Sequence, residues 1–311
     1  MRSEPGSAAI LRAAVTHRIV PGAGARGGDA LATVEEGPLP AGTGIFIPGR
    51  IPCGECAACR RALCDACSAP RALVMSSDGR VVVPDRFITA VDGALSSLRA
   101  IAAGLYADII GAAGRAGLGA GDTAIWIGEP AWTRAGVAWS HSRGARTFVL
   151  SASAPPASPP TTSGPVPLAL SSGPAAWRTT IADAEAAGGP AGGRPERRIF
   201  VCGAGDELAR VALELVTPGS TVSFLRGAPS VLAGLDVAPP LRLFTGGAGH
   251  PDLIPEALAA MSRGEVDTDG LFVEVTAAEQ ETALAEFRRG LDRPMPVVAY
   301  VVATSPSASG H

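Results

Sequence analysis

The chain has 311 residues, 47% of them hydrophobic, and a formal net charge of −3 at pH 7, so it can bury a full core and is expected to form two domains. Its basic residues are scattered, which argues against nucleic acid and anionic lipid as partners. No apolar run approaches the ~20 residues of a membrane span, and Pro, Gly and Glu interrupt the N-terminus where a secretory signal is apolar, so we expect a cytoplasmic protein.

Arginine supplies all 26 basic residues, because the sequence contains no lysine. Asparagine is absent as well, and the AT-rich codons of both residues make a GC-rich genome the simplest explanation. The chain therefore has no lysine for a Schiff base or a phosphate loop. Acid-base work at neutral pH is left to the histidines, which are His17, His141, His250 and His311.

The first hundred residues are predicted to be short strands around a cysteine-rich lobe. Apolar runs predict strands at 10–17, 30–37 and 45–52. A turn at Gly79 and Arg80 leads back into the apolar run RVVVP, and an Ala-rich segment with apolar residues at helical spacing predicts a helix over 96–116.

The lobe contains a ladder of four cysteines with the spacing C-x2-C-x2-C-x7-C, formed by Cys53, Cys56, Cys59 and Cys67. Two short steps and one longer step let three thiolates surround a tetrahedral ion from a tight turn, while the fourth closes the shell from a returning loop. The spacing predicts one structural zinc per chain. Cys64 is interpreted as a bystander or as a replacement for Cys67, and the alternative to a metal site is a disulfide.

The middle of the chain alternates strands and helices. A strand at 123–128, a helix within 129–145 and a strand at 146–151 form a βαβ unit, the start of a parallel sheet. Pro and Ser predict a long irregular loop over 151–167, and Gly and Pro interrupt the chain again at 188–195. The remaining predicted elements are strands at 197–203, 220–227, 241–247 and 296–303, a strand after 266, and helices at 207–216, 253–262 and 279–291.

The motifs PGRIPCGECAAC, GLGAGDTAIWIG, LELVTPGSTVSFLRG and HPDLIPEALAAMSRGEVD follow one another in an order that resembles the zinc-containing medium-chain alcohol dehydrogenases, and among them the cyclohexene-carbonyl-CoA dehydrogenase types. The resemblance implies an α/β fold: a truncated GroES-like β domain formed from both chain ends and a Rossmann-type domain with a doubly wound parallel sheet. The implied boundaries are 1–100 for the first domain with its zinc lobe at 48–70, 101–263 for the Rossmann-type domain, and 264–311 for the return and the C-terminal tail.

The family oxidises alcohols with NAD(P) and a second, catalytic zinc, whose ligand positions are altered here. The position of its zinc-binding histidine aligns with Gly28, and that of a further Cys or Asp ligand aligns with Gly104. The segment with its remaining cysteine ligand is missing, since no cysteine precedes Cys53. On this comparison the catalytic zinc site is absent. Asp29 is the acidic group at a former ligand position, and His17 is a candidate proton carrier near the remnant of the cleft.

The family's glycine-rich nucleotide loop, G-x-G-x-x-G, aligns with Gly128, Pro130 and Thr133. Proline removes an N–H and adds a ring where the pyrophosphate should approach the backbone, which makes NAD(P) binding doubtful. The candidate cofactor contacts are Gly128, Arg134, which can pair with a phosphate, and Ser151, which stands where an acidic residue would hold the ribose. Because serine does not repel a 2′-phosphate, any nucleotide preference leans to NADP.

These replacements favour a degenerate, non-catalytic or partner-dependent member of the family, working as a homodimer or with a related subunit through the apolar edge segment 241–246. The alternatives are an NAD(P)-dependent, zinc-independent oxidoreductase, a non-redox enzyme that uses the interdomain cleft, and a gene product without selected function. His141 is interpreted as a surface or packing residue, His250 as a loop residue and Cys202 as part of the core.

Overall fold

The computed structural model describes residues 10–19, 29–60, 67–151, 165–188, 196–203, 205–225, 230, 241–245, 251–269, 271–276, 278–279, 281–282, 285 and 299–303. Sequence predictions that lie outside the described residues include Gly28, Cys64, His250, His311 and most of the helix at 279–291. Within these ranges, no helix is long and apolar enough to cross a membrane.

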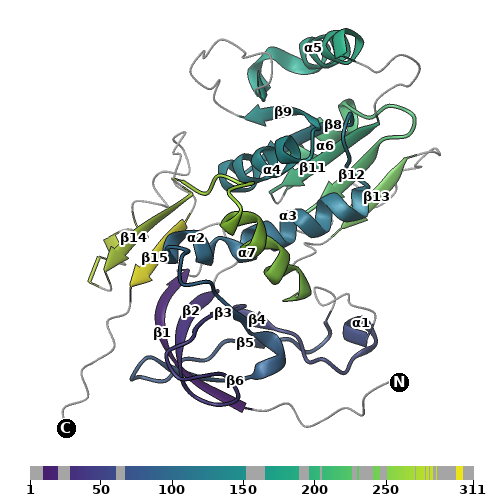
Figure 1. Cartoon of the computed structure of the whole chain (residues 1–311). Coiled ribbons are helices and arrows are strands. Elements are labelled where there is room, and N and C mark those ends of the chain that lie inside the picture. The colour runs from purple at the N-terminus through teal and green to yellow at the C-terminus, as the bar shows by residue number, and fades with distance from the viewer. Residues whose placement is uncertain are drawn as a thin grey trace. The chain divides into compact units, whose positions relative to one another are not determined.

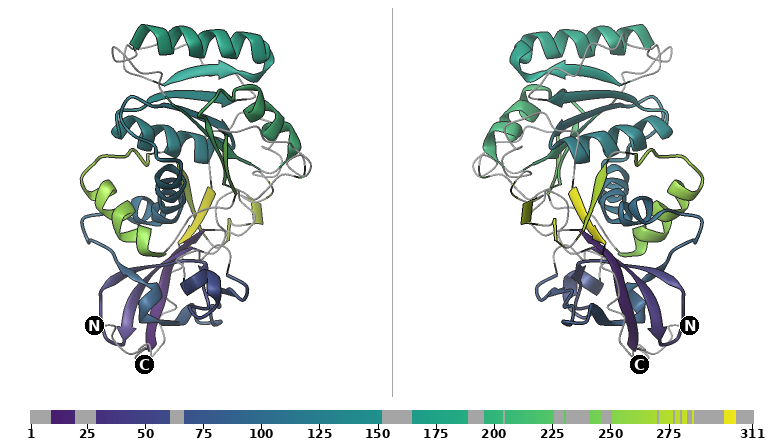
Figure 2. Two further views of the ribbon diagram at one scale, coloured as in Figure 1. Left: turned by 90° about the vertical axis from the view of Figure 1, so that its right-hand side faces the viewer. Right: turned by 90° about the vertical axis from the view of Figure 1, so that its left-hand side faces the viewer.

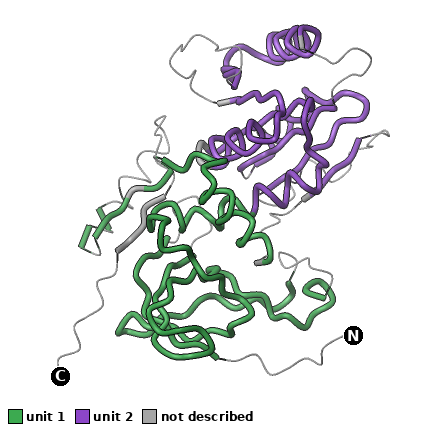
Figure 3. The backbone as a smooth tube through the Cα atoms, in the orientation of Figure 1, with its two compact units in different colours: residues 1–107, 250–311 green, residues 108–249 purple. Residues whose placement is uncertain are grey.

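The chain divides into two compact units (Figure 3). Unit 1 comprises residues 1–107 and 250–311, and unit 2 comprises residues 108–249. Each unit has its own core of buried apolar side chains, as independent structural domains do. The domain boundaries predicted from the sequence, after residues 100 and 263, stay predictions.

Unit 1 is built on a seven-stranded sheet to which both ends of the chain contribute. Its strands are β1 (Ile10–Ile19), β2 (Ala30–Glu36), β3 (Gly44–Ile47), β6 (Arg80–Pro84), β7 (Thr89–Ala90), β14 (Phe272–Thr276) and β15 (Ala299–Ala303). The early strand β1 pairs antiparallel with β2, β6 and the late strand β15, which in turn pairs parallel with β14 (Figure 1). The prediction of a β domain made from both chain ends is confirmed.

Alternation of side chains explains how this sheet buries one face. Leu11, Ala13 and Val15 of β1 are at most 3% exposed and belong to the core of unit 1, while the residues between them face outward, because successive strand residues point to opposite faces. Ile10, on the outward face, is 68% exposed.

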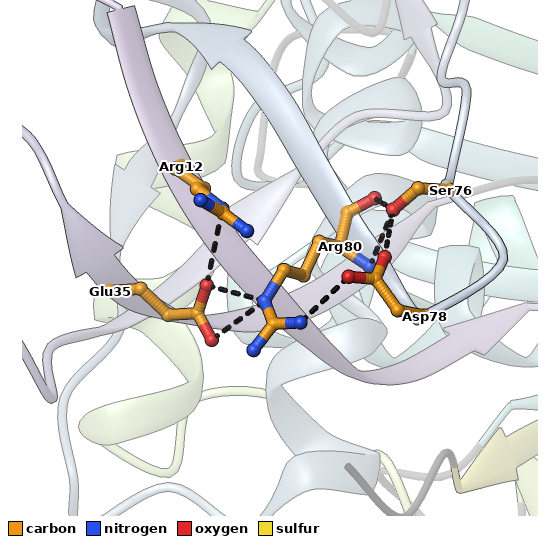
Figure 4. Close-up of polar contacts among 5 residues, drawn as sticks. All are labelled: Arg12, Glu35, Ser76, Asp78 and Arg80. Atoms are coloured by element: carbon orange, nitrogen blue, oxygen red, sulfur yellow. Dashed lines mark hydrogen bonds and ion pairs between the residues drawn. The ribbon is translucent and has the colours of Figure 1, made fainter. Parts of the chain in front are cut away.

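A cluster of charges lies on the outward side of β1, β2 and β6 (Figure 4). The Arg80 guanidinium donates from Nε to both carboxylate oxygens of Glu35, over 3.0 and 2.8 Å, and from Nη1 to Asp78 Oδ2 over 2.6 Å. Arg12 approaches the same Glu35 carboxylate at 3.5 Å. Hydrogen bonds from Ser76 and Arg80 lower the pKa of Asp78 to about 2, and hydrogen bonding to Arg80 also lowers the pKa of Glu35.

The helix predicted over 96–116 is interrupted at Ala102. Ser96 caps the first part, accepting a hydrogen bond from the Arg99 N–H over 3.4 Å. The Ala102 N–H bonds to the carbonyl three residues back, Arg99, instead of four, which tightens and ends that helix. The two helices are α2 (Ser97–Ile101), in unit 1, and α3 (Ala103–Ala116), which begins in unit 1 and continues into unit 2 after residue 107. Unit 1 also contains α1 (Ala57–Arg60) and α7 (Ile254–Ser262).

Unit 2 contains a six-stranded parallel sheet in the order β10-β9-β8-β11-β12-β13. Its strands are β8 (Thr123–Gly128), β9 (Arg146–Ser151), β10 (Val166–Ala169), β11 (Arg197–Cys202), β12 (Thr221–Phe224) and β13 (Arg242–Thr245). All five pairings are parallel. Numbered within this sheet the order is 3-2-1-4-5-6, that of a dinucleotide-binding Rossmann sheet, so the predicted fold class is confirmed.

Helices cover both faces of this sheet. They are α4 (Pro130–Ser142), α5 (Gly173–Gly188) and α6 (Asp206–Glu214). Ile125 and Ile127 of β8 belong to the core cluster that contains residues of α5 and α6. Trp126, between them, stacks on Phe200 of β11 at 4.2 Å between ring centroids and donates from Nε1 to Ser140 of α4 over 2.9 Å.

Two features of this unit differ from the sequence predictions. The irregular loop was predicted to extend over 151–167, but strand β10 already begins at Val166 and pairs in parallel with β9. The prediction was therefore too long. Pro167 is accommodated there because β10 is an edge strand, where a missing N–H costs no ladder bond. Helix α5 was not predicted at all, and Figure 2 shows it at the β10 end of the sheet.

Candidate functional site

The cysteine lobe is part of unit 1 and is bounded by a short antiparallel pair, β4 (Arg50–Ile51) and β5 (Arg71–Ala72). The predicted strand at 45–52 is thus divided into β3 and β4. Because β4 and β5 hold the two ends of the lobe together, the cysteines between them are brought to one place. The one-turn helix α1 lies within the lobe and carries Cys59.

The four predicted metal ligands come together. The Sγ atoms of Cys53, Cys56, Cys59 and Cys67 all lie within 4.8 Å of one another, and those of Cys53 and Cys59 are 3.9 Å apart. All four are free cysteines, so the disulfide alternative is wrong for them. Cys67 is buried and the other three are partly exposed, as for a site that closes on its own loop.

Backbone amides point at the sulfur atoms. The N–H of Cys53 donates to Sγ of Cys67 over 3.3 Å, that of Cys56 to Cys53 over 3.4 Å, and that of Cys59 to Cys56 over 3.5 Å. Hydrogen bonds from the amides of Cys59 and Ser68 lower the pKa of Cys56 to about 5, and the Cys53 amide lowers the pKa of Cys67. Burial raises the pKa of Cys59 to about 12. Donors directed at sulfur stabilise thiolates, the form that binds metal.

This donor set fits a structural zinc ion. Four thiolates with mutual distances below 4.8 Å match the closed tetrahedral shell of zinc, in which sulfur lies about 2.3 Å from the metal. A shell completed by protein ligands leaves no position for a substrate. The site is therefore suited to holding the lobe together, and chemistry has to be sought elsewhere.

At two positions that the sequence resemblance aligned with catalytic-zinc ligands, the structure places a carboxylate beside a glycine. A Cβ atom on Gly104, in the first turn of α3, would stand 1.9 Å from Oδ2 of Asp29. The Asp29 side chain is 2% exposed, and its Oδ1 accepts a hydrogen bond from the Gly49 amide over 2.7 Å. Gly28, the other aligned ligand position, lies outside the described residues. No side chain larger than glycine fits at residue 104 while Asp29 keeps this place.

His17 and Asp29 do not meet. Nδ1 of His17 lies 3.1 Å from the Thr16 hydroxyl, and Nε2 lies 4.0 Å from the carboxylate of Glu274 on β14. Burial lowers the pKa of His17, and the Glu274 charge opposes that shift. Among the described residues, the acidic group that His17 approaches is Glu274 and not Asp29, and sequence reasoning did not single out Glu274.

At the carboxyl edge of the parallel sheet, the start of the segment aligned with the family's glycine-rich loop is bound to the neighbouring strand. The Glu129 N–H donates to the Cys202 carbonyl at the end of β11 over 2.7 Å. Gly128 has φ 118°, and a Cβ there would stand 2.5 Å from the same carbonyl oxygen. Glycine is thus required at residue 128 because the Cys202 carbonyl of β11 lies so close. The N–H of Glu129 already donates a hydrogen bond within the protein.

Acidic side chains stand at the helix N-termini of this edge. Glu129 occupies the N-cap position of α4, and Asp206 and Glu207 lie in the first turn of α6. Both helices begin beside β8 and β11, where the strand order reverses and where a Rossmann sheet binds its dinucleotide. Carboxylates there repel a pyrophosphate that the helix N-termini would otherwise attract.

The other predicted cofactor contacts are dispersed along this edge. Ser151 is the last residue of β9, and Gly128 is the last residue of the neighbouring strand β8. Arg134 is exposed on α4, and His141 is exposed in the last turn of that helix. Cys202 is fully buried, so its prediction as a core residue is confirmed.

A close-packing glycine is found one turn further along α4 than the aligned motif. A Cβ on Gly136 would stand 2.3 Å from the Trp126 ring, so α4 approaches β8 through Gly136, whereas Thr133 occupies the last glycine position of the motif. The sequence signal for this contact was the pair of a tryptophan in a buried strand and a glycine in the next helix.

Several solved structures with this fold are described as dehydrogenases. The alcohol dehydrogenase TADH from Thermus sp. ATN1 superposes with a TM-score of 0.71 and 18% identity over 98% of this chain and 95% of that one. Galactitol-1-phosphate dehydrogenase from Escherichia coli gives 0.73 and 11% over 98% and 95%. A structure described as a zinc-binding dehydrogenase from Sinorhizobium meliloti 1021, bound to NADP, gives 0.67 and 18% over 97% and 93%. No protein-family model and no curated protein sequence matches the chain.

These superpositions cover nearly the whole chain, so the fold expected from the resemblance to zinc-containing medium-chain alcohol dehydrogenases is confirmed. The identities of 11–18% show the fold alone, because a shared fold carries many different activities.

Proposed function

We propose that this protein is a degenerate relative of the zinc-type alcohol dehydrogenases that keeps the structural zinc and has lost the zinc-dependent redox centre. Its work is then non-catalytic, as a cytoplasmic subunit beside a second copy or a related active chain. The observation that carries the proposal is the place of Asp29, whose carboxylate fills the space that a ligand side chain at residue 104 would need.

The metal chemistry of the family needs an open zinc site with three protein ligands and a position for the alcohol oxygen. Gly28 and Gly104 have no side chain to donate, and no cysteine precedes Cys53. Asp29 is engaged by the Gly49 amide. A single buried carboxylate held by the backbone supplies one ligand at most, which is too few to retain a catalytic ion.

The nucleotide edge supports the same proposal from unit 2. The N–H of Glu129 is bound to β11, Pro130 has no N–H, and carboxylates stand at the start of α4 and of α6. These features act together against a pyrophosphate, since they remove donors and add negative charge. The two losses lie in different units, so neither follows from the other.

Calorimetric titration of the zinc-loaded protein with NADH and then NADPH tests the proposal. We expect no heat of binding and no competition at millimolar nucleotide. Micromolar binding of either nucleotide would overturn the proposal and favour the zinc-independent oxidoreductase instead. Zinc content and far-UV circular dichroism of the same sample establish that a negative result comes from folded protein.

A pairing surface is available on β13, the last strand in the described sheet of unit 2. An edge strand has unpaired backbone groups on one side, which a second strand can use. We include in the proposal that this edge pairs with a second copy or a related chain. Light scattering tests the homodimer directly: twice the mass of the chain supports it, and a monomer mass leaves the related subunit as the partner to be sought.

A further inference from the structure

Arg86 lies outside the cysteine lobe in sequence, on the short helical turn Asp85–Phe87, yet its side chain reaches the first ligand loop. Its Nη2 donates to the Cys53 carbonyl over 3.4 Å. Its Cζ stands 4.7 Å from the centre of the Phe87 ring, in cation–π geometry. The guanidinium is thus held between an aromatic ring and the backbone of a metal-ligand residue.

The loop is shaped to receive this side chain. Gly54 follows Cys53, has φ 78°, and would place a Cβ 2.8 Å from Nη2 and 3.0 Å from Cζ of Arg86. The left-handed backbone favours glycine at this position, and the absence of a side chain there lets the guanidinium approach the loop closely. The backbone turn that presents the Sγ atoms of Cys53 and Cys56 is in direct contact with a positive charge.

Among the residues that the structure describes, no carboxylate neutralises that charge. Among the described residues, Arg86 forms no ion pair with Asp or Glu, unlike Arg80 and Arg197, each of which is paired. Four thiolates around a divalent zinc ion leave an excess of negative charge. An unpaired guanidinium beside the ligand loop is placed to offset that excess, because electrostatic effects of neighbouring cations favour the thiolate form.

We propose that Arg86 is a positioning residue of the metal centre, which fixes the Cys53–Cys56 loop through the Cys53 carbonyl and supplies a positive charge to the zinc-bound thiolates. This inference rests on the structural zinc of the proposed function. It assigns a role to a residue that is separated from the cysteine ladder in the sequence and that sequence reasoning did not single out.

The test measures zinc affinity of the full-length protein by competition with a chromophoric chelator, for wild type, Arg86→Gln, Arg86→Lys and Arg71→Gln. Arg71 is the matched control, because it lies on β5 at the exit of the same lobe and is exposed. We expect Arg86→Gln to lose about ten- to a hundredfold in affinity, the usual cost of removing a group that orients metal ligands. Arg86→Lys keeps the charge but loses the planar contact, so its zinc affinity should lie between those of wild type and Arg86→Gln. The zinc affinity of Arg71→Gln should stay near that of wild type.

Cobalt substitution separates positioning from unfolding. At saturating cobalt, Arg86→Gln should still show the thiolate charge-transfer and ligand-field bands of a tetrahedral four-sulfur site, since all four cysteines remain. Loss of those bands, wild-type affinity in Arg86→Gln, or an equal loss in Arg71→Gln would overturn the role of Arg86. Failure of the wild-type protein to bind zinc would instead overturn the structural zinc of the proposed function itself.

Discussion

At the scale of single residues, Gly104 and Asp29, two positions that the resemblance aligned with metal ligands, are in close contact. Gly104 provides space in the first turn of α3, and Asp29 fills that space with a carboxylate. The N-terminus of a helix is favourable for a negative charge, so a carboxylate there stabilises α3 without any metal.

Replacing Gly104 by alanine is expected to destabilise the protein by about 1–3 kcal/mol, the usual cost of overpacking a buried site. The added methyl group would overlap Asp29 Oδ2, which lies 1.9 Å from the ideal Cβ position. Denaturant unfolding measures the change. The effect should appear although alanine is the better helix former by about 1 kcal/mol.

Gly114 is the control on the same helix, because nothing lies within 4 Å of a Cβ placed there. Gly114→Ala should leave stability unchanged or raise it by up to about 1 kcal/mol. If both alanines changed stability in the same direction, the contact between Gly104 and Asp29 would not be the reason.

At the scale of elements, helix α5 shows how a segment with a weak sequence signal is fixed by its contacts. Trp177 and Ile181 are at most 3% exposed in the core of unit 2, and Trp177 Nε1 donates to the Ala169 carbonyl over 2.8 Å. One turn after Ile181, Glu185 binds Arg197 of β11 with two hydrogen bonds of 2.9 and 2.8 Å. Trp177, Ile181 and Glu185 are spaced four residues apart and therefore lie on one side of α5, the side that faces the sheet.

Glu185→Ala is expected to destabilise unit 2 by about 3–5 kcal/mol, because it leaves the buried Arg197 guanidinium without its charged partner. The side chain of Arg197 is only 7% exposed, so water cannot replace the carboxylate fully. Asp183→Ala, at an exposed position of the same helix, should change stability by less than about 0.5 kcal/mol. Equal effects in chemical denaturation would show that general loss of acidic charge is responsible.

The charge cluster on β1, β2 and β6 (Figure 4) should make part of the stability of unit 1 depend on pH. The pKa of Asp78 is lowered from 3.8 to about 2 and that of Glu35 is lowered from 4.5. A carboxyl group whose pKa is lower in the folded than in the unfolded protein stabilises the fold fully at a pH above its unfolded-state pKa. This contribution is lost as the pH falls through the folded-state pKa.

Arg80→Gln removes the shared partner of both carboxylates and should lower the melting temperature slightly at pH 7, since exposed ion pairs contribute little. The difference from wild type should shrink as the pH falls from above 4.5 towards 2 and should also shrink in high salt. A difference that is the same at pH 7 and pH 2 would contradict the electrostatic explanation.

At the scale of the whole molecule, the chain consists of two units with separate cores. A structural metal site stabilises the unit that contains it, because the site does not exist in the unfolded chain. The cysteine lobe belongs to unit 1, whereas Glu185 and Arg197 belong to unit 2. A substitution in the cysteine lobe should therefore change the unfolding of unit 1, and a substitution of Glu185 or Arg197 should change the unfolding of unit 2.

Cys56→Ser, or removal of zinc with a strong chelator, is expected to reduce the zinc content below the one ion per chain predicted for wild type and to lower the unfolding temperature of unit 1. Differential scanning calorimetry should show this as a shift of one transition, while Glu185→Ala shifts the other. An unchanged zinc content and melting profile in Cys56→Ser would contradict the structural zinc. Movement of both transitions together would show that the units unfold as one.

The sequence by itself determined the elements whose signals are local. The spacing of Cys53, Cys56, Cys59 and Cys67 indicated the metal lobe, since one turn and one returning loop bring them together. The buried run at 123–128 followed by a helix and a second strand indicated the parallel sheet, because each step depends on neighbours in the chain.

Only the tertiary structure decided which distant residues meet. Asp29 beside Gly104, the amide of Glu129 on the Cys202 carbonyl, Trp126 against Gly136, and Arg86 on the Cys53 loop each depend on the path of the chain between them. Helix α5 escaped prediction because its apolar stripe is narrow and its anchor, Arg197, lies on another element. Such contacts are fixed by packing and charge in three dimensions, and no periodicity along the chain encodes them.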